Sequence, residues 1–416
     1  MAKLILHIKS SYLSRGIILC IAALIGAILI FFALCTYTKE PSISPLLPKS
    51  NIKEPVDQNT FYDDPKTRYT MDEPMTNWDE KRRKWLENNP NIASKNKNSV
   101  LVITGSQPWS CKNPKGDHML LRFFKNKVDY CRIHGYEIFY NNAFFDPKMK
   151  SVWAKVPILR AAMLAHPEMD WIFWMDADAI FTDMEFKIPL ERYKDHNLVV
   201  HGWPKMIYED KSWVSVNTGA VLIRNCQWAM EFLDVWAEMG PRGPNYEEWG
   251  RILRSTLSDK TFPNSDEQSS LVYLLLKGEK KWRNKIYVEN EYLLHGYWLD
   301  IVGNFDEITR KYEDMERRDV RLRRRHAEAV NEGYAAEKGR YVGEGWRRPF
   351  VTHFTGCQPC SGDNNPEYEG DSCWVGMERA LNFADNQVLR NYGFVRPDVG
   401  NASHVRPLPF DYPGTG

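Results

Sequence analysis

Short apolar runs and amphipathic stretches alternate along the chain from residue 99 onwards. Residues 100–104 (VLVIT) form a β-branched run that ends at a Gly-Ser pair, which predicts a strand. The next segment repeats apolar residues with helical spacing, on a face that contains Leu120, Phe124, Val128 and Cys131. Residues 136–140 (YEIFY) predict a second strand. This strand-helix-strand opening predicts a parallel sheet with right-handed crossovers.

The alternation continues towards the carboxyl end. Residues 151–165 predict a helix, and residues 171–175 (WIFWM) predict a buried strand because they are apolar throughout. Further strands are predicted at residues 198–201, 220–223, 285–288 and 350–353. The glycine-rich turn of dinucleotide enzymes and the lysine-bearing phosphate loop of nucleoside triphosphatases are both missing from the sequence. The pattern predicts an α/β fold with a Rossmann-like nucleotide-binding sheet.

An uncharged stretch near the start indicates a membrane anchor. Residues 16–35 carry no charge, over about the 20 residues that a helix needs to cross a bilayer core. Lys3, Lys9 and Arg15 precede it, so the positive charge predicts a cytosolic tail at residues 1–15 and a signal anchor at residues 16–37, with the remaining chain across the membrane. A cleaved signal peptide is the alternative, but its apolar region is typically about 7 to 15 residues long.

Residues 38–98 are polar, rich in proline and without clear periodicity, which predicts an extended stem. Within this stretch, residues 78–89 (WDEKRRKWLENN) predict one solvated helix that ends before Pro90. Residues 99–416 are long enough to form one large α/β domain with a substantial core.

The charges balance almost completely, at 55 basic and 54 acidic residues. A net charge of +1 gives no general electrostatic reason to expect nucleic acid as a partner. The basic stretch at residues 321–325 (RLRRR) is a local exception, and it predicts the exposed face of a long charged helix within residues 306–338.

Six of the eight cysteines lie beyond the predicted anchor, at positions 111, 131, 226, 357, 360 and 373. An even number in an oxidising compartment is compatible with disulfides, although six cysteines allow 15 pairings. The pair in residues 357–360 (CQPC) has no second such pair, so disulfide bonding is favoured over a zinc ribbon. Asn401 begins an Asn-Ala-Ser acceptor sequence for glycosylation.

Two carboxylates directly follow the buried strand at residues 171–175. Asp176 and Asp178 are separated by one residue and stand at the carboxyl end of that strand, where open α/β sheets bind their ligands. Two such oxygen ligands can hold a divalent cation that bridges a diphosphate, which suggests a nucleotide-sugar site. A solvated loop is the alternative for an isolated Asp-x-Asp pair.

Longer motifs resemble a known family. The stretches ITGSQPWSCKNPKGDH, FWMDADAIFTDMEF, NLVVHGWP, SVNTGAVLIRNCQW, DEQSSLVYLL, THFTGCQPC and ERALNFADNQVLR occur in order between residues 100 and 413. Together they resemble the plant Golgi α-glycosyltransferases of hemicelluloses, which include galactomannan galactosyltransferases and xyloglucan xylosyltransferases. The resemblance implies a GT-A fold, a UDP-sugar donor, Mn²⁺ and retention of the anomeric configuration.

The same resemblance assigns roles to individual residues. Asp176 and Asp178 match the metal-binding pair, and His353 matches a third metal ligand; without the resemblance, His353 would be a hydrogen-bonded strand histidine. A further set of residues is implied to contact the donor, namely Thr104, Gly105, Ser106, Lys155, Asp176, Asn217, Thr218, Gly219 and Gly356.

The trio Asp266, Glu267 and Gln268 is implied to lie beneath the transferred sugar, with Gln268 near the anomeric carbon. From the residues alone, the acidic pair marks only the start of a helix. Two positions depart from the xylosyltransferase pattern, because Glu267 stands where that pattern has aspartate and Gln358 where it has lysine.

The charged segment between residues 298 and 349 resembles the galactomannan galactosyltransferases instead. The implied reaction moves galactose from UDP-galactose to O6 of a β-1,4-mannan backbone, at a Golgi membrane and in the lumen. A xyloglucan xylosyltransferase using UDP-xylose, or a non-catalytic subunit of a polysaccharide synthase complex, remains as an alternative. A β-linked polysaccharide acceptor and homo- or hetero-oligomers with other polysaccharide synthases are the further partners implied.

Overall fold

The computed structural model describes residues 59–93, 98–318, 348–401 and 403–408. The predicted anchor at residues 16–37 and the basic stretch at residues 321–325 lie outside this part of the chain. Among the described residues, no helix is both long and apolar enough to span a bilayer.

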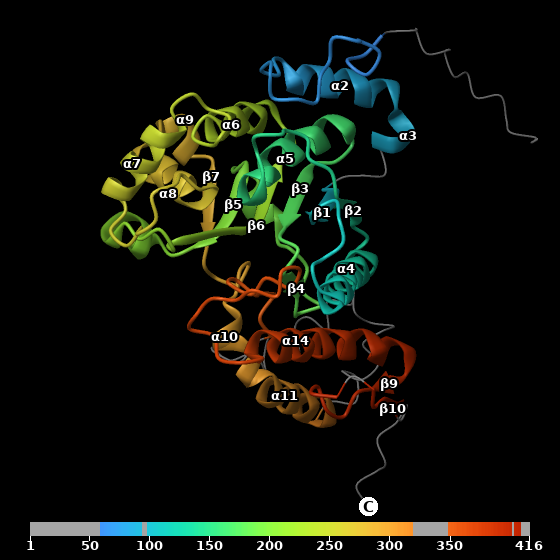
Figure 1. Cartoon of the computed structure of the whole chain (residues 1–416). Helices are drawn as coiled ribbons and strands as arrows, with labels where there is room; N and C mark the ends of the chain where they lie inside the picture. The colour runs from blue at the N-terminus through green and yellow to red at the C-terminus, as the bar shows by residue number, and fades with distance from the viewer. Residues whose placement is uncertain (1–58, 94–97, 319–347, 402, 409–416) are drawn as a thin grey trace, which may run out of the picture. The chain divides into compact units, whose positions relative to one another are not determined.

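A mixed sheet of six strands forms the centre of the described region (Figure 1). In spatial order its strands are β2 (Glu137–Asn141), β1 (Val100–Gly105), β3 (Trp171–Met175), β6 (Val216–Arg224), β5 (Leu198–Gly202) and β7 (Ile286–Glu289). The pairs β1·β2, β1·β3 and β5·β7 are parallel. Strand β6 runs antiparallel to both β3 and β5, so the expectation of a parallel sheet was only partly correct. The chain passes from β5 to β6 through a short π-helix, η3 (Met206–Asp210).

A second, two-stranded sheet lies beyond the carboxyl end of β3. Strand β4 (Ala179–Phe181) pairs antiparallel with β8 (Val351–His353). The sequence predicted a strand at the position of β8 but did not predict β4. This small sheet pairs residues that are 170 to 174 positions apart in the sequence.

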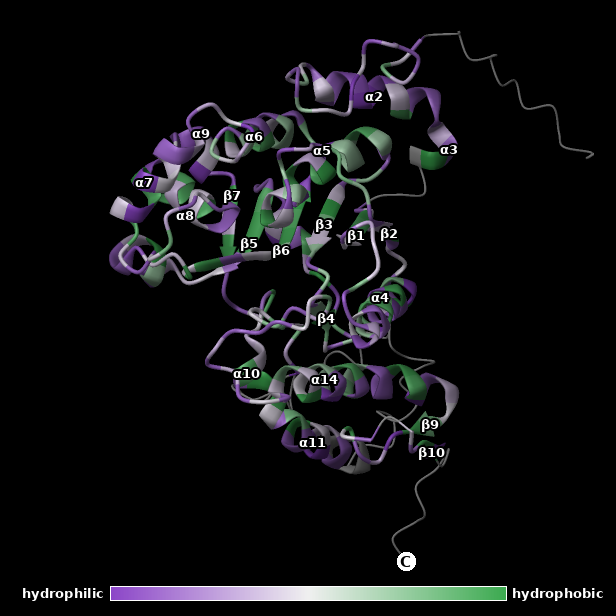
Figure 2. Ribbon diagram, in the orientation of Figure 1, coloured by the Kyte–Doolittle hydropathy of each residue, from purple (hydrophilic) through white to green (hydrophobic). Residues whose placement is uncertain are grey.

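Alternate residues of the main strands face two separate cores. In β1, Leu101 and Ile103 belong to one apolar cluster and Val100 and Val102 to another. Figure 2 shows the strands as predominantly hydrophobic and the outer helices as mixed. The helices that follow the strands in this region are α5 (Lys155–Ala165), α6 (Gln227–Ala237), α7 (Tyr246–Thr256), α8 (Glu267–Lys277) and α9 (Lys280–Arg283), with the 3₁₀ segments η1 (Ser151–Ala154) and η2 (Leu190–Tyr193).

Helix α4 (Pro114–His134) begins at the side-chain cap of Asn113, whose oxygen accepts from the Gly116 amide. Of the predicted face only Cys131 is buried; Leu120, Phe124 and Val128 are partly buried, and Met119, Phe123 and Tyr130 are buried instead. The apolar period was misleading because three polar residues also occupy the buried face, Asn126, Lys127 and Asp129.

Residues 59–93, predicted to be part of an extended stem, pack on the domain instead. Helix α2 (Trp78–Asn88) was predicted as solvated, yet the Trp78 side chain is fully buried and its indole N–H donates to Asn225 at 2.7 Å. Arg82 of the same helix forms an ion pair with Asp170 at 2.8 Å. A short helix, α3 (Pro90–Ala93), follows.

The remaining helices form a further layer below β4 and α4 in Figure 1. They are α10 (Trp298–Ile301), η4 (Val302–Asn304), α11 (Phe305–Arg318), α14 (Ser372–Leu389) and η6 (Arg390–Tyr392), with the short strands β9 (Phe394–Val395) and β10 (Arg406–Pro407). Stacking of Phe305 on Phe383, with ring centroids 4.1 Å apart, joins α11 to α14.

Candidate active site

The two carboxylates lie where the sequence predicted them, directly after β3. The Asp176 amide donates to the Gly219 carbonyl of β6 at 2.7 Å, and its Oδ1 accepts from the Trp174 indole at 2.5 Å. Burial alone would raise the pKa of Asp176, but the charges of Lys155 and His353 and the indole hydrogen bond outweigh it and lower that pKa. Asp176 is therefore held ionised and oriented at the strand end.

His353 reaches the carboxylates through the small sheet. Its backbone pairs with Ala179, so its ring lies beside the residues that precede β4. The Nε2 atom lies 3.2 Å from Asp178 Oδ1 and 3.9 Å from Asp176 Oδ2. One ligand atom from each of the three residues lies within 4.8 Å of the others. Two carboxylates and an imidazole at this spacing fit a divalent cation.

Gly219 explains how the histidine ring fits between the strands. A Cβ atom at this position would lie 2.2 Å from His353 Cε1 and 2.5 Å from Nδ1. The Gly219 amide donates to the side chain of Asn217 at 2.7 Å. The Asn217-Thr218-Gly219 stretch, predicted to contact the donor, thus also shapes the space that His353 occupies.

Lys155 is buried at the start of α5 rather than solvated. Its ammonium donates to Glu267 Oε1 at 2.8 Å and to the Thr218 carbonyl at 2.9 Å, and lies 3.4 Å from Asp176 Oδ1. Burial would lower the pKa of Lys155, but the two carboxylates outweigh it and raise that pKa. The lysine is therefore a fixed positive charge next to Asp176.

The three residues at the start of α8 make different contacts. Asp266 caps the helix by accepting from the Ser269 amide at 2.8 Å and also accepts from Lys260 at 2.6 Å. Glu267 is buried and accepts hydrogen bonds from Lys155 and from the Thr218 hydroxyl, each at 2.8 Å. The Gln268 amide donates to the Trp213 carbonyl at 3.1 Å.

A cleft of about 760 Å³ connects these groups. Of the predicted residues, its lining contains Asp176, Asp178, Asn217, Thr218, Gly219, Asp266, Glu267, Gln268, His353 and Gly356. An adjoining cavity of about 380 Å³ shares Asp178 and Gln358 with the cleft and includes Ser106. Thr104 is buried and lines neither cavity, and Gly105 packs against the Asn141 backbone.

Asn401, the predicted glycosylation site, is exposed.

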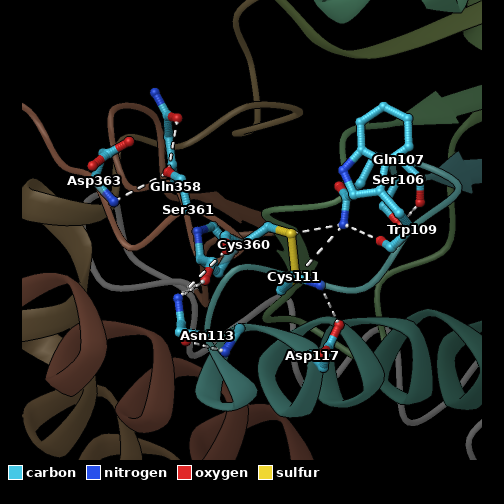
Figure 3. The surroundings of a disulfide bond; sticks show 12 residues. Ser106, Gln107, Trp109, Cys111, Asn113, Asp117, Gln358, Cys360, Ser361 and Asp363 are labelled. Atoms are coloured by element: carbon cyan, nitrogen blue, oxygen red, sulfur yellow. Dashed lines mark hydrogen bonds between the residues drawn. A yellow bond between two sulfur atoms is a disulfide. The ribbon is translucent and has the colours of Figure 1, made fainter.

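Two disulfides hold the loops around the smaller cavity. Cys357 and Cys360 do not bond to each other, because Cys357 pairs with Cys373 and Cys360 with Cys111. The second bond ties the loop after β1 to the loop that carries Gln358 (Figure 3). Cys131 and Cys226 are free.

Comparison with known proteins identifies the family. Residues 96–364 match the galactosyl transferase GMA12/MNN10 family. The chain belongs to this family. It is 56% identical to galactomannan galactosyltransferase 1 of Cyamopsis tetragonoloba, over 91% of this chain and 86% of that one. It is 58% identical to glycosyltransferase 6 of Arabidopsis thaliana, over 85% of this chain and 83% of its relative.

A probable xyloglucan 6-xylosyltransferase 3 of Arabidopsis thaliana is 46% identical, over 82% of this chain and 69% of the relative. Among solved structures, a glycosyltransferase involved in the glycosylation of the major capsid of PBCV-1 is 13% identical, with a TM-score of 0.36, over 62% of this chain and 94% of that one. The family and these relatives make the chain a sugar-transferring enzyme.

Two residues that lie against the predicted ligands, His295 and Lys127, were not predicted from the sequence. His295 lies edge-on to His353, with ring centroids 4.9 Å apart, and burial followed by the charges of His353 and His201 keeps the pKa of His295 well below its usual value. Lys127 of α4 contacts the backbone on both sides of Asp178. Its only sequence signal was a lysine inside an amphipathic helix, which ordinarily indicates a solvated residue.

Proposed function

We propose that this enzyme transfers galactose from UDP-galactose to O6 of a β-1,4-mannan-type backbone, with retention of configuration, on a fold of the GT-A type. The observation that carries the proposal is the convergence of Asp176, Asp178 and His353 in one cleft with the residues that open α8. The 56% identity to a protein named galactomannan galactosyltransferase 1 supports the choice of sugar and backbone.

Asp176, Asp178 and His353 would hold Mn²⁺, which tolerates an imidazole ligand better than Mg²⁺ does. The fit rests on three observations of this site: the spacing of the ligand atoms, the orientation of His353 Nε2 towards both carboxylates, and the absence of a Cβ at Gly219. When bound, the cation supplies positive charge to the diphosphate of the departing UDP.

Lys155 does not line the cleft but lies buried behind it, where it fixes Asp176 and Glu267 and thereby connects the metal site to the floor beneath the sugar. Gln268 carries a neutral amide, which is a poor covalent nucleophile, so we favour attack by the acceptor hydroxyl on the face from which UDP leaves. A phosphate oxygen of the leaving group would then take the acceptor proton.

The proposed setting is the Golgi lumen, with residues 16–37 as a type II signal anchor. The two disulfides support an oxidising compartment. The exposed Asn401 is accessible to glycosylation there. Association with itself or with other polysaccharide synthases belongs to the same proposal.

A xyloglucan 6-xylosyltransferase is the second candidate, favoured by the 46% identity to a relative of that name. Galactose differs from xylose by a C6 hydroxymethyl group and by the orientation of its C4 hydroxyl. A site that pairs polar groups with both hydroxyls can discriminate UDP-galactose from UDP-xylose by about 10⁴-fold in rate. A site that only leaves room for the extra carbon would discriminate between them by about 10- to 200-fold.

The test is a matrix of donors and acceptors with the full chain in Mn²⁺. UDP-galactose and UDP-xylose are each offered with mannohexaose and cellohexaose, and the product linkage is determined by NMR. Galactosylation of mannohexaose should dominate. Preferential xylosylation of cellohexaose would replace the proposal by the second candidate. Absence of transfer from either donor would favour a non-catalytic subunit of a polysaccharide synthase complex.

A further inference from the structure

We propose that Lys127, a buried lysine of α4, is a positioning residue that holds the turn around Asp178 in the shape required for metal binding. The inference rests on the metal site of the proposed function. The hydrogen bonds of the Lys127 ammonium go to backbone carbonyls and not to the side chains of the three proposed ligands, so Lys127 acts through the backbone.

The contacts of Lys127 bracket Asp178 in the sequence. Its ammonium donates to the Ala179 carbonyl at 2.6 Å and lies 3.3 Å from the Ala177 carbonyl. These are the carbonyls of the residues immediately before and after Asp178. Holding the Ala177 carbonyl restrains the peptide group that joins Ala177 to Asp178, and holding the Ala179 carbonyl restrains the peptide group that follows Ala179, so the backbone is fixed on both sides of Asp178 and with it the direction of the carboxylate.

The preceding residue secures the strand that follows the turn. The Asn126 side chain donates to the Phe181 carbonyl at 2.9 Å and accepts from the Phe181 amide at 2.8 Å. This reciprocal pair satisfies the backbone of β4 on the side that faces α4. Since β4 also pairs with β8, the same strand determines the position of His353. Lys127 therefore holds the turn that carries Asp178, and the adjacent Asn126 holds the strand that positions His353.

The cost of burying a lysine indicates that this charge has a function. Lys127 is fully buried within an otherwise mainly apolar helix face, and transfer of a charged group from water is expensive unless it is compensated. Burial lowers the pKa of Lys127 to about 7, and the charges of Asp178 and Asp176 counteract part of that shift. An apolar residue would fill the same space more cheaply but would leave both carbonyls without their donor.

Lys127 differs in this respect from Lys155, which contacts Asp176 directly. It also differs from Lys125, two positions earlier on α4, whose ammonium pairs with Asp129 and Asp385 and is 57% exposed. Lys125 therefore provides a matched control on the same helix.

The experiment compares Mn²⁺ binding by the full chain and its variants, in the presence of a fixed concentration of UDP. Free Mn²⁺ is measured by electron paramagnetic resonance, so that the readout does not depend on turnover. Loss of an outer partner of a metal site typically weakens affinity by about 10- to 100-fold. We expect Lys127→Met to weaken Mn²⁺ binding by this factor, and Lys125→Met to leave it unchanged.

Asp178→Ala separates this inference from the proposed function. If the unmodified chain binds no Mn²⁺, or binds it as well after Asp178→Ala, the metal site itself is wrong and the inference falls with it. If Asp178→Ala abolishes binding while folded Lys127→Met binds Mn²⁺ normally, only the role of Lys127 is overturned. Should Lys127→Met fail to fold, Lys127→Gln is judged by the same criterion, and failure of both to fold assigns Lys127 to stability instead.

Discussion

A single methyl group at Gly219 should inactivate the enzyme without unfolding it. In Gly219→Ala the new Cβ would lie 2.2 Å from His353 Cε1, whereas ordinary contact begins at about 3.4 Å. The ring must therefore move by about 1.2 Å, because the new Cβ is attached to the backbone of β6, which is paired with β3 on one side and β5 on the other. Displacement of a catalytic group by about 1 Å can cost about 10²-fold in rate. We expect a loss of this size in kcat, together with weaker activation by Mn²⁺.

The assay measures sugar transfer over a range of Mn²⁺ concentrations, with circular dichroism and the melting temperature recorded for the same preparation. Gly303→Ala is the matched control, since a Cβ at Gly303 meets no atom within 4 Å. The control should retain normal rates and normal activation by Mn²⁺. Gly219→Ala protein that transfers sugar at the rate of this control would refute the claim that His353 must occupy its observed position.

Four further outcomes follow from the site and the fold. Asp178→Ala and His353→Ala should each remove most turnover in a folded protein, and near-normal rates at low Mn²⁺ would contradict the ligand assignment. Glu267→Ala removes one partner of a buried ion pair, so the free energy of unfolding in urea should fall by about 3 kcal/mol; an unchanged midpoint would show that the pair is dispensable. Burial lowers the pKa of His201 from 6.5 to about 4, so the unfolded chain binds more protons than the folded chain between these pH values. The free energy of unfolding should therefore keep its full contribution from neutral His201 above pH 6.5 and should decrease by about 3 kcal/mol down to pH 4. The decrease should be smaller in His201→Phe. In intact Golgi vesicles, a carboxyl-terminal tag should resist protease until detergent is added, and digestion without detergent would reject the proposed topology.

The strands of the main sheet could be predicted because their apolar runs are local features. Residues 171–175 predicted β3 with the bounds that the structure shows, and the carboxylates after it followed directly. Strand direction could not be predicted in the same way, because the antiparallel place of β6 depends on which strands become neighbours. The burial of Trp78 likewise depends on Asn225, which is 147 residues away.

The third ligand, His353, could be named only through the family resemblance. No local pattern connects His353 to Asp178, since their proximity depends on the three-residue strand β4. Lys127 was missed for a related reason. A lysine in a helix is normally solvated, and only the tertiary structure shows that its ammonium meets two carbonyls.

The position of Glu267 gives a physical reason for one departure from the xylosyltransferase pattern. Its Oε1 lies 2.8 Å from both the Lys155 ammonium and the Thr218 hydroxyl. An aspartate on the same backbone is shorter by one methylene, so it could not keep both contacts without a shift of α8 or of Lys155. Because Lys155 also contacts Asp176, such a shift would reach the proposed metal site. The length of this side chain therefore couples the start of α8 to the proposed cation ligands, and Glu267 contributes by positioning Lys155.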